Sequence, residues 1–217
     1  MASQSLWYYT GLPNTVIDAI EEDLDRNFSP DLKPSVVGHS PDGTGAKTKV
    51  NELNTSIRNA QNAWIPSSHW IAGFCWHYVM RANRENFLYD LTCIDGESMQ
   101  YTRYGEGMFY DWHNDSGLAV QYKPRSVGNH GDAVQEDYIN ENTESVRKLS
   151  FALQLSSPDD YEGGNVVLLD EGGKKYIVPR QRGTVVLFDS RTQHRVNKVK
   201  SGVRKSIVGW VVGPRWK

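Results

Sequence analysis

The strongest constraint on the fold is a run of short β-type segments in the C-terminal half of the chain. The segments are rich in β-branched and aromatic residues and are separated by Gly, Asp and Pro turns, and they cover residues 99–104, 108–114, 148–156, 164–169, 175–178, 183–188, 193–199 and 204–212. Many short strands with such turns are typical of a jelly roll or a β-sandwich. We therefore predict an α+β fold that is mainly β.

The N-terminal half is predicted to support this β core with helices. Residues 13–28 place Val16, Ile17, Ile20 and Leu24 at helical spacing with acidic residues between them, which predicts an amphipathic helix. Residues 67–88 are apolar on most faces and predict a helix packed on the sheet. We expect His69 and His77 of that segment to be core or partly buried residues, because no carboxylate lies at ligand spacing on the same face.

A chain of 217 residues fits one domain of ordinary size. We expect a single domain over residues 1–217, with residues 1–98 as mostly helical support and residues 99–214 as the β core.

Two H-x-D triplets are candidates for metal binding. One such triplet and a distant His could supply two imidazoles and one carboxylate, the ligand set that holds Fe(II) on one face and leaves positions open. His113 and Asp115 follow an aromatic strand pattern, and residues i and i+2 of a strand share a face. His130 and Asp132 lie in a polar, glycine-bearing stretch typical of a solvated loop. We therefore favour His113 and Asp115, with His194 as the third ligand.

A basic residue follows His194 after ten positions. Arg204 begins the last predicted strand and shares a face with Ser206 by the period of two. A guanidinium offers a planar fork to a carboxylate, and the hydroxyl adds a donor, so the pair could bind the distal carboxylate of a dicarboxylate cosubstrate. The alternative is that Arg204 is an ordinary surface cation.

These residues carry a resemblance to a known family. The string Tyr104-x-x-Gly107-x-x-Tyr110-x-x-His113-x-Asp115, followed by His194, Arg204 and Trp210, resembles the 2-oxoglutarate/Fe(II) dioxygenases of the prolyl 4-hydroxylase type. The segments YGEGMFYDWHNDS, LSFALQLSSPDDYEGGNVVL and HRVNKVKSGVRKSIVGW are most similar to the small bacterial and phage PKHD-type hydroxylases. The resemblance implies a double-stranded β-helix, or jelly roll, in which two sheets enclose the metal.

The resemblance also implies cofactors and site roles. It implies Fe(II) held by His113, Asp115 and His194, and 2-oxoglutarate held at its distal carboxylate by Arg204 and Tyr104. It implies further that Tyr110 and Trp210 line the substrate pocket, although both fit plain core aromatics equally well. Ascorbate is a further candidate cofactor. Animal and plant prolyl 4-hydroxylases commonly have Lys where Arg204 stands, which changes the shape of the anchor but keeps its charge.

Bulk composition limits the choice of partners. The 24 basic and 26 acidic residues give a net charge of −2 without a basic block, which argues against electrostatic nucleic-acid binding. The two cysteines, Cys75 and Cys93, favour a reducing cytoplasm, the host's if the chain is phage-encoded, and a disulfide between them is left open. The absence of a leader pattern and of a long apolar run predicts neither secretion nor a membrane span. We expect a monomer or a weak dimer.

Three functions remain open at this point. The first is a prolyl hydroxylase acting on a protein or peptide with O₂, and the polar stretch of residues 116–147 is then expected to be a lid that governs the substrate. The second is an oxygenase of a small molecule or of another amino-acid residue. A nucleobase demethylase is disfavoured because Trp210 occupies the position of the second Arg typical of that class. The third is a jelly-roll binding module without activity.

Overall fold

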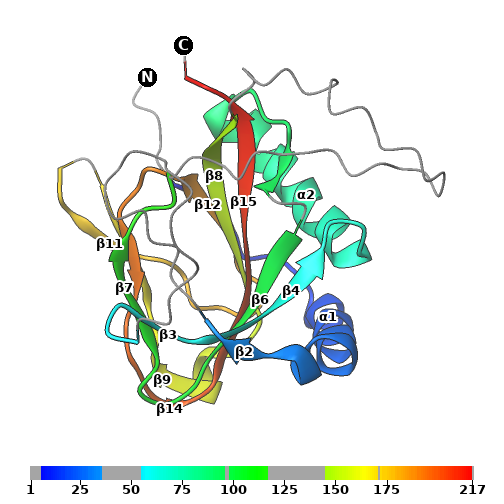
Figure 1. The fold of residues 1–217 in the computed structure, drawn as a ribbon, viewed down its shortest axis with the longest axis vertical. Helices are drawn as coiled ribbons and strands as arrows, with labels where there is room; N and C mark the ends of the chain where they lie inside the picture. The colour runs from blue at the N-terminus through cyan, green and yellow to red at the C-terminus, as the bar shows by residue number, and fades with distance from the viewer. Residues whose placement is uncertain (1–5, 36–54, 96–97, 117–144, 171, 217) are drawn as a thin grey trace, which may run out of the picture.

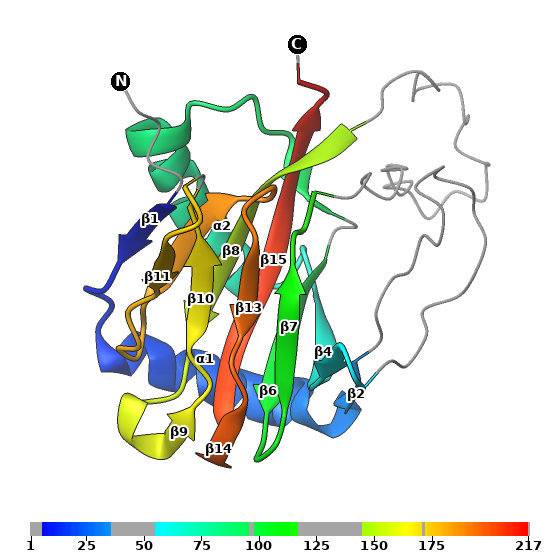
Figure 2. The same ribbon diagram turned by 90° about the vertical axis from the view of Figure 1, so that its left-hand side faces the viewer.

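The computed structural model describes residues 6–35, 55–95, 98–116, 145–170 and 172–216. Two β-sheets face each other, and two helices cover the outer face of the larger sheet (Figure 1). The smaller sheet lies in front when the molecule is turned, with the larger sheet behind it (Figure 2). The mainly β, α+β class predicted from the sequence is confirmed.

The larger sheet has eight strands within the described residues, and all their pairings are antiparallel. Its path runs β1-β12-β8-β15-β6-β4-β2, and β5 pairs with β15. The strands are β1 (Leu6–Tyr9), β2 (Lys33–Pro34), β4 (Gln61–Pro66), β5 (Cys93–Ile94), β6 (Ser98–Tyr104), β8 (Ser145–Gln154), β12 (Val185–Asp189) and β15 (Arg204–Pro214).

The smaller sheet runs in the order β11-β10-β13-β7-β3, and β9 and β14 form a separate antiparallel pair. These strands are β3 (Arg58–Asn59), β7 (Phe109–His113), β9 (Tyr161–Gly163), β10 (Val166–Leu169), β11 (Lys175–Ile177), β13 (His194–Val196) and β14 (Val199–Gly202). The 193–199 segment, predicted as one strand, is thus divided between two pairings, because β13 pairs with β7 and β14 with β9.

Strand β8 shows why the larger sheet is buried on both faces. Phe151 and Leu153 belong to the apolar core that the helices share, whereas Ala152 packs with Val186 and Phe188 on the opposite face. Successive side chains of a strand point to opposite faces, so one face meets the helices and the other faces the smaller sheet. Its near-continuous apolar sequence is typical of a doubly covered strand.

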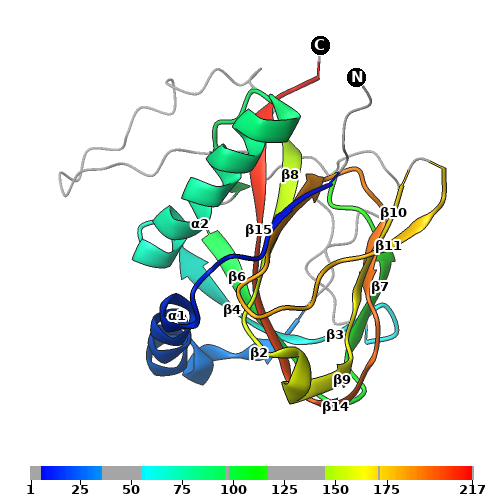
Figure 3. The ribbon, with the colours of Figure 1, turned by 180° about the vertical axis from the view of Figure 1, so that it is seen from behind.

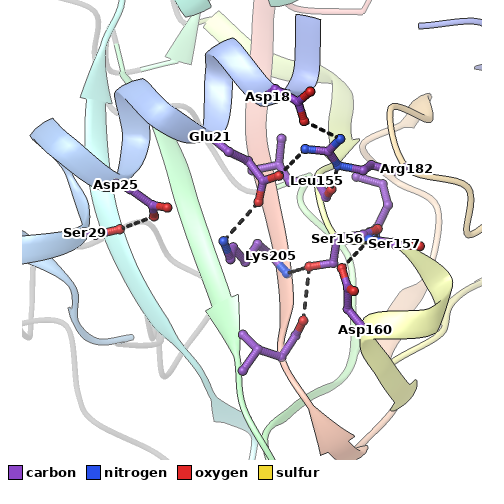
Figure 4. Close-up of polar contacts among 12 residues, drawn as sticks. Asp18, Glu21, Asp25, Ser29, Leu155, Ser156, Ser157, Asp160, Arg182 and Lys205 are labelled. Atoms are coloured by element: carbon purple, nitrogen blue, oxygen red, sulfur yellow. Dashed lines mark hydrogen bonds and ion pairs between the residues drawn. The ribbon is translucent and has the colours of Figure 1, made fainter. Parts of the chain in front are cut away.

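Helix α1 (Asn14–Asn27) confirms the predicted amphipathic helix. Ile17, Ile20 and Leu24 are buried against the larger sheet. Acids beside this buried face bind two partly buried basic residues: Arg182 pairs with Asp18 at 2.7 Å and also with Glu21, and Lys205 Nζ donates to Glu21 at 3.0 Å (Figure 4). The helix is therefore joined to the strands by packing and by ion pairs.

The predicted helix over residues 67–88 is shorter and changes type. Helix α2 (Trp70–Ala82) lies on the same outer face as α1 (Figure 3) and continues as a π-helix, η2 (Asn83–Phe87). The Asn83 side chain accepts the Tyr89 N–H at 2.8 Å and donates to the Tyr89 carbonyl at 2.9 Å, and Leu88 then adopts a left-handed φ of 55°. The chain leaves the helix there because a side chain has taken over the backbone groups of the next turn.

The two histidines of this region have different environments. His69 is half-buried, with its Nε2 3.5 Å from the Asp23 carboxylate and its ring against Phe28, as expected. His77 is exposed, so the expectation of a core or partly buried residue is wrong there. It lies on the side of α2 that faces away from the sheet. Because apolar residues occur on most faces of this helix, the sequence did not show which face is buried.

The first 98 residues supply strands as well as helices, which the sequence prediction missed. β1 pairs with β12, and β4 pairs with β6 over its whole length. The short β5 pairs with the end of β15. The larger sheet is therefore built from both halves of the chain.

Most of the segment predicted to be a lid lies outside the described residues. The structure describes residue 116 and residues 145–147 of it. The last three residues are not part of a connection, because β8 already begins at Ser145 and pairs there with the end of β15.

Neither cysteine is in a disulfide; Cys75 is buried and Cys93 is half-buried. Burial raises the pKa of the Cys75 thiol to about 12, so it stays protonated and unreactive near neutral pH. No helix among the described residues combines the length and the apolar composition needed to cross a membrane.

Gly202 lies at the end of β14 with a φ of +75°, and an added Cβ would lie 2.1 Å from the Asp160 carbonyl oxygen. We expect Gly202→Ala to lower the free energy of unfolding by at least about 2 kcal/mol, because a left-handed backbone costs roughly 1–2 kcal/mol and Asp160 must also move. Urea denaturation measures this change. Gly173→Ala is the matched control, since Gly173 has a φ of +77° but open space around it. Equal losses in the two variants would contradict the role of the Asp160 contact.

Candidate metal centre

His113 and His194 lie opposite each other on neighbouring strands. β7 ends at His113, β13 begins at His194, and the antiparallel register pairs the two residues directly. Paired residues of an antiparallel sheet place their side chains on one face. The ring centroids are 4.1 Å apart, and His194 also contacts Phe188 of the larger sheet at 4.7 Å. Both imidazoles therefore lie between the sheets.

Asp115 completes the group from just beyond the end of β7. Its backbone N–H donates to the Ser190 carbonyl at 2.8 Å, which ties it to the segment after β12. Its carboxylate oxygens lie 3.8 Å from His113 Nε2 and 3.3 Å from His194 Nε2. Atoms that each lie about 2.0–2.2 Å from one metal are roughly 3–4 Å apart. The structure thus brings the three predicted ligands together at a spacing that suits one ion.

The second nitrogen of each imidazole is already engaged. His113 Nδ1 lies 2.7 Å from the Asp111 carbonyl and His194 Nδ1 lies 3.0 Å from the Thr192 carbonyl. A carbonyl only accepts, so each Nδ1 carries the hydrogen and each Nε2 keeps a free lone pair. Burial and the neighbouring His194 lower the pKa of His113 to about 4, which keeps its ring neutral near pH 7. Both rings are therefore oriented as metal ligands.

Asp115 is buried, 9% exposed, and is held by hydroxyl groups. Ser150 Oγ donates to its Oδ2 at 2.7 Å, and Ser190 Oγ lies 3.0 Å from Ser150 Oγ. Burial raises the pKa of the Asp115 carboxyl, but the two imidazoles, Ser150 and the Trp210 indole together outweigh it, so the pKa is lowered overall. The carboxylate stays charged in an interior where an isolated charge would be costly. This is the anionic ligand that a divalent cation requires.

Ser150 offers a test of this outer layer. We expect Ser150→Ala to weaken Mn²⁺ or Fe²⁺ binding by about 10- to 100-fold, because the carboxylate loses the bond that fixes its orientation. Isothermal titration calorimetry of the metal measures the change, and Ser201→Ala, on the exposed face of β14, is the control. Unchanged metal affinity in Ser150→Ala would show that Ser150 does not orient the ligand.

Tyr110 and Trp210, the two predicted pocket aromatics, both lie next to the metal ligands. The Tyr110 ring stacks on His113 with centroids 3.5 Å apart and 15° between planes. The Trp210 indole lies beside Asp115, and Arg147 covers its ring at 4.3 Å. Arg58, which the sequence reasoning did not single out, lies over Tyr110 at 4.7 Å and is only 7% exposed. These side chains therefore border the metal ligands.

Arg204 is buried, not a surface cation. It is 3% exposed, its Nη1 donates to Ser206 Oγ at 3.3 Å, and its guanidinium faces the Tyr104 ring at 5.6 Å. The structure therefore places Arg204, Ser206 and Tyr104 together. Among the described residues Arg204 has no carboxylate partner, and a buried cation without one is costly unless an anion binds there.

Arg204 borders a cavity whose other lining residues were not predicted. Polar groups come from Gln154, Tyr161, Arg180 and Thr184, and apolar groups from Ala152, Val166, Val178 and Val186. Among the described residues, no carboxylate lines this cavity. Tyr161 falls in a segment that carries the family resemblance, which was the only available signal for it. The chemistry of the lining suits an anion with an aliphatic body.

The alternative triplet of His130 and Asp132 lies outside the described residues. Within the described residues, the group of His113, Asp115 and His194 is the one whose ligand atoms lie close enough together to hold a metal ion. The preference for His113 over His130 stays a prediction.

A family model described as the 2OG-Fe(II) oxygenase superfamily matches residues 99–212, more than half of the chain. The chain belongs to the 2OG-Fe(II) oxygenase superfamily. Membership implies Fe(II) and 2-oxoglutarate as the metal and the cosubstrate, and the buried His-Asp-His group suits that metal.

Curated relatives of this superfamily match part of the chain. A PKHD-type hydroxylase of Parvibaculum lavamentivorans is 34% identical over 110 residues, which are 51% of this chain and 39% of the relative. One of Synechococcus elongatus is 31% identical over 156 residues, which are 70% of this chain and 60% of the relative. The chain thus spans about half the length of the curated relatives it matches.

Solved structures of the superfamily share the fold over nearly the whole chain. A Pseudomonas putida prolyl-4-hydroxylase has a TM-score of 0.66 at 18% identity and covers 99% of this chain and 95% of its own. A Trichoplax adhaerens prolyl hydroxylase in complex with a hypoxia inducible factor peptide fragment also scores 0.66, at 16% identity, covering 96% and 84%. These likenesses confirm the predicted jelly-roll fold.

Proposed function

We propose that this protein is a 2-oxoglutarate- and Fe(II)-dependent dioxygenase that hydroxylates a prolyl residue in a protein or peptide. The observation that carries the proposal is a buried pair of sites in one barrel. Two imidazoles and one carboxylate form a metal site, and a buried guanidinium that has no carboxylate partner among the described residues forms an anion site. A 2-oxo dicarboxylate needs both sites.

The residues fit the roles that these cofactors require. His113, Asp115 and His194 would hold Fe(II) on one side, and Arg204, with Ser206 and Tyr104, would hold the distal carboxylate of 2-oxoglutarate. When bound, the metal and cosubstrate supply the oxidising power that inserts one oxygen atom of O₂ into a C–H bond, with succinate and CO₂ as coproducts. The protein binds and orients the metal, the cosubstrate and the substrate, and it excludes water from the site. No side chain has to act as a general base.

The prolyl substrate is supported by the relatives. The Pseudomonas putida protein is a prolyl-4-hydroxylase, and the Trichoplax adhaerens enzyme was solved with a peptide. Tyr110 and Trp210 would line the pocket for the substrate, because both lie against the ligands and present aromatic surface. Aromatic faces suit a compact apolar ring such as that of proline.

The setting of the activity is part of the proposal. The pairing of β1 with β12 and of β4 with β6 supports one domain built from both halves of the chain. Cys75 and Cys93, which are not joined in a disulfide, suit the reducing cytoplasm. Ascorbate would support turnover, and the protein would act as a monomer or weak dimer.

The test combines cosubstrate turnover with a product search. The purified protein is incubated with Fe(II), 2-oxoglutarate, ascorbate and a library of proline-containing peptides, and succinate and peptide mass are measured. We expect succinate to form together with peptides that have gained one oxygen atom at proline, and Asp115→Ala to give neither. Succinate coupled to a small molecule or to another residue instead would favour the alternative oxygenase. Absence of metal and 2-oxoglutarate binding would favour a binding module without activity.

A further inference from the structure

The hydroxyl of Tyr161 lies in the anion cavity with its hydrogen-bonding directions already constrained. Tyr161 begins β9 and is 6% exposed. Its oxygen lies 3.1 Å from Gln154 Nε2 and 3.4 Å from Arg180 Nε. It also lies close enough to Arg204 for the two side chains to interact.

Both of these hydrogen bonds are donated to the phenol oxygen. Gln154 Nε2 also donates to the Ser156 carbonyl at 3.1 Å, and because a carbonyl only accepts, the amide orientation is fixed with its NH₂ toward Tyr161. Arg180 has donors only. A phenol oxygen that accepts two hydrogen bonds keeps one O–H to donate, and among the described residues no acceptor for it is found.

The cavity around this O–H offers further donors, and the described residues bring no negative charge to it. Arg204 and Arg180 bring two guanidinium groups, and Thr184 Oγ1 is buried without a hydrogen-bond partner in the described part of the chain. Arg180 is held on Tyr161 by three contacts: its Nε meets the hydroxyl, its Nη2 donates to the Tyr161 carbonyl at 2.9 Å, and its guanidinium lies 4.4 Å above the ring. A buried O–H without an acceptor costs about 1–3 kcal/mol, so the cavity is arranged for an anionic ligand.

We propose that Tyr161 donates its hydroxyl hydrogen to the distal carboxylate of 2-oxoglutarate beside Arg204, and that Arg180 is a positioning residue that holds Tyr161 for this contact. The inference rests on the proposed function, which makes 2-oxoglutarate the cosubstrate. Tyr161 would then act beside Tyr104, which is expected to hold the same carboxylate. The Tyr104 ring lies against the guanidinium of Arg204, and the two residues are paired across β6 and β15.

Substitution of the two tyrosines separates the possibilities. 2-Oxoglutarate is titrated calorimetrically into the protein loaded with Mn²⁺, which binds the cosubstrate without turnover. We expect Tyr161→Phe to weaken 2-oxoglutarate binding by about tenfold or more, because a hydrogen bond to a charged group contributes roughly 1.5–3 kcal/mol. Mn²⁺ affinity should be unchanged in both variants. Tyr104→Phe should weaken 2-oxoglutarate binding less than Tyr161→Phe does.

Arg180 is tested by a readout that a structural defect would not produce. Arg180→Met should raise the KM for 2-oxoglutarate by about threefold to tenfold, because Tyr161 loses a hydrogen bond that orients it. The kcat should be unchanged. This variant also tests the inference if Tyr161→Phe fails to fold. An unchanged KM would show that Arg180 does not position the phenol.

The outcomes distinguish this inference from the proposed function. Wild-type binding of 2-oxoglutarate with an unchanged affinity in Tyr161→Phe would overturn the role of Tyr161 and leave the proposed function standing. A larger loss in Tyr104→Phe than in Tyr161→Phe would return the role to Tyr104. No binding of 2-oxoglutarate to the wild-type Mn²⁺ protein would overturn both.

Discussion

Asp115→Ala is expected to remove tight metal binding and all turnover. Within the described part of the chain, this carboxylate is the only anion of the metal site, and without it two imidazoles would have to hold a divalent cation in a buried place. Loss of a residue that hydrogen-bonds to a metal ligand already lowers the metal affinity by about 10- to 100-fold. Loss of the ligand itself should therefore lower it by at least about 100-fold. Calorimetric titration with Mn²⁺ and with Fe²⁺ under argon measures it.

His113→Ala and His194→Ala should show the same loss, and His130→Ala is the control. His130 belongs to the competing H-x-D triplet, so a variant there should bind metal like the wild-type protein. Retained binding in His113→Ala together with loss in His130→Ala would reverse the assignment of the ligands.

Arg204→Met is expected to separate cosubstrate binding from stability. The affinity for 2-oxoglutarate should fall by about 10- to 150-fold, which corresponds to the roughly 1.5–3 kcal/mol of a charge-assisted hydrogen bond. The free energy of unfolding without ligand should not fall, because Arg204 has no carboxylate partner in the described residues and Met fills similar apolar volume.

Thermal unfolding with and without 2-oxoglutarate measures both parts of this prediction. The wild-type protein should gain stability from saturating 2-oxoglutarate in the presence of Mn²⁺, and Arg204→Met should gain almost none. Arg204→Lys, which keeps the charge but not the fork, should lie between them. An equal gain in wild type and Arg204→Met would mean that the distal carboxylate binds elsewhere.

The metal site could be predicted from the sequence because its information is local. Two ligands lie in one triplet, and the strand pattern around His113 set it apart from His130. The sequence prediction placed His113 and Asp115 on one face of the same strand, whereas the structure ends β7 at His113 and fixes Asp115 through the Ser190 carbonyl. That contact joins positions 75 residues apart, and no local pattern encodes it.

The anion cavity could be predicted only in part, because its residues come from strands that meet through long-range pairing. Arg204 and Ser206 were accessible through the period of two in one strand. Tyr161 and Arg180 reach Arg204 only after β9 and the segment that follows β11 have packed against β15. The roles proposed for these two residues depend on the directions of their hydrogen bonds, and the spacing of residues in a sequence does not predict those directions.

The missed N-terminal strands have a different cause. β1 is four residues long and lies at the edge of the larger sheet, so it is too short to show a clear alternation. β4 was missed because the exposed Trp64 lies between the buried Ala63 and Ile65, so its apolar residues do not alternate with polar ones. Edge strands take their conformation from the neighbour they pair with, which for β1 is β12.

The course of β15 limits where related chains can differ in length. Arg204 at its start and Trp210 further along are an even number of residues apart, so the pleat turns both side chains toward the barrel interior. A single inserted or deleted residue between them would turn one of the two outward and would shift the pairing with β6 and β8. Natural length variation should therefore accumulate in the turns, and an insertion scan of the whole chain should find β15 among its least tolerant segments.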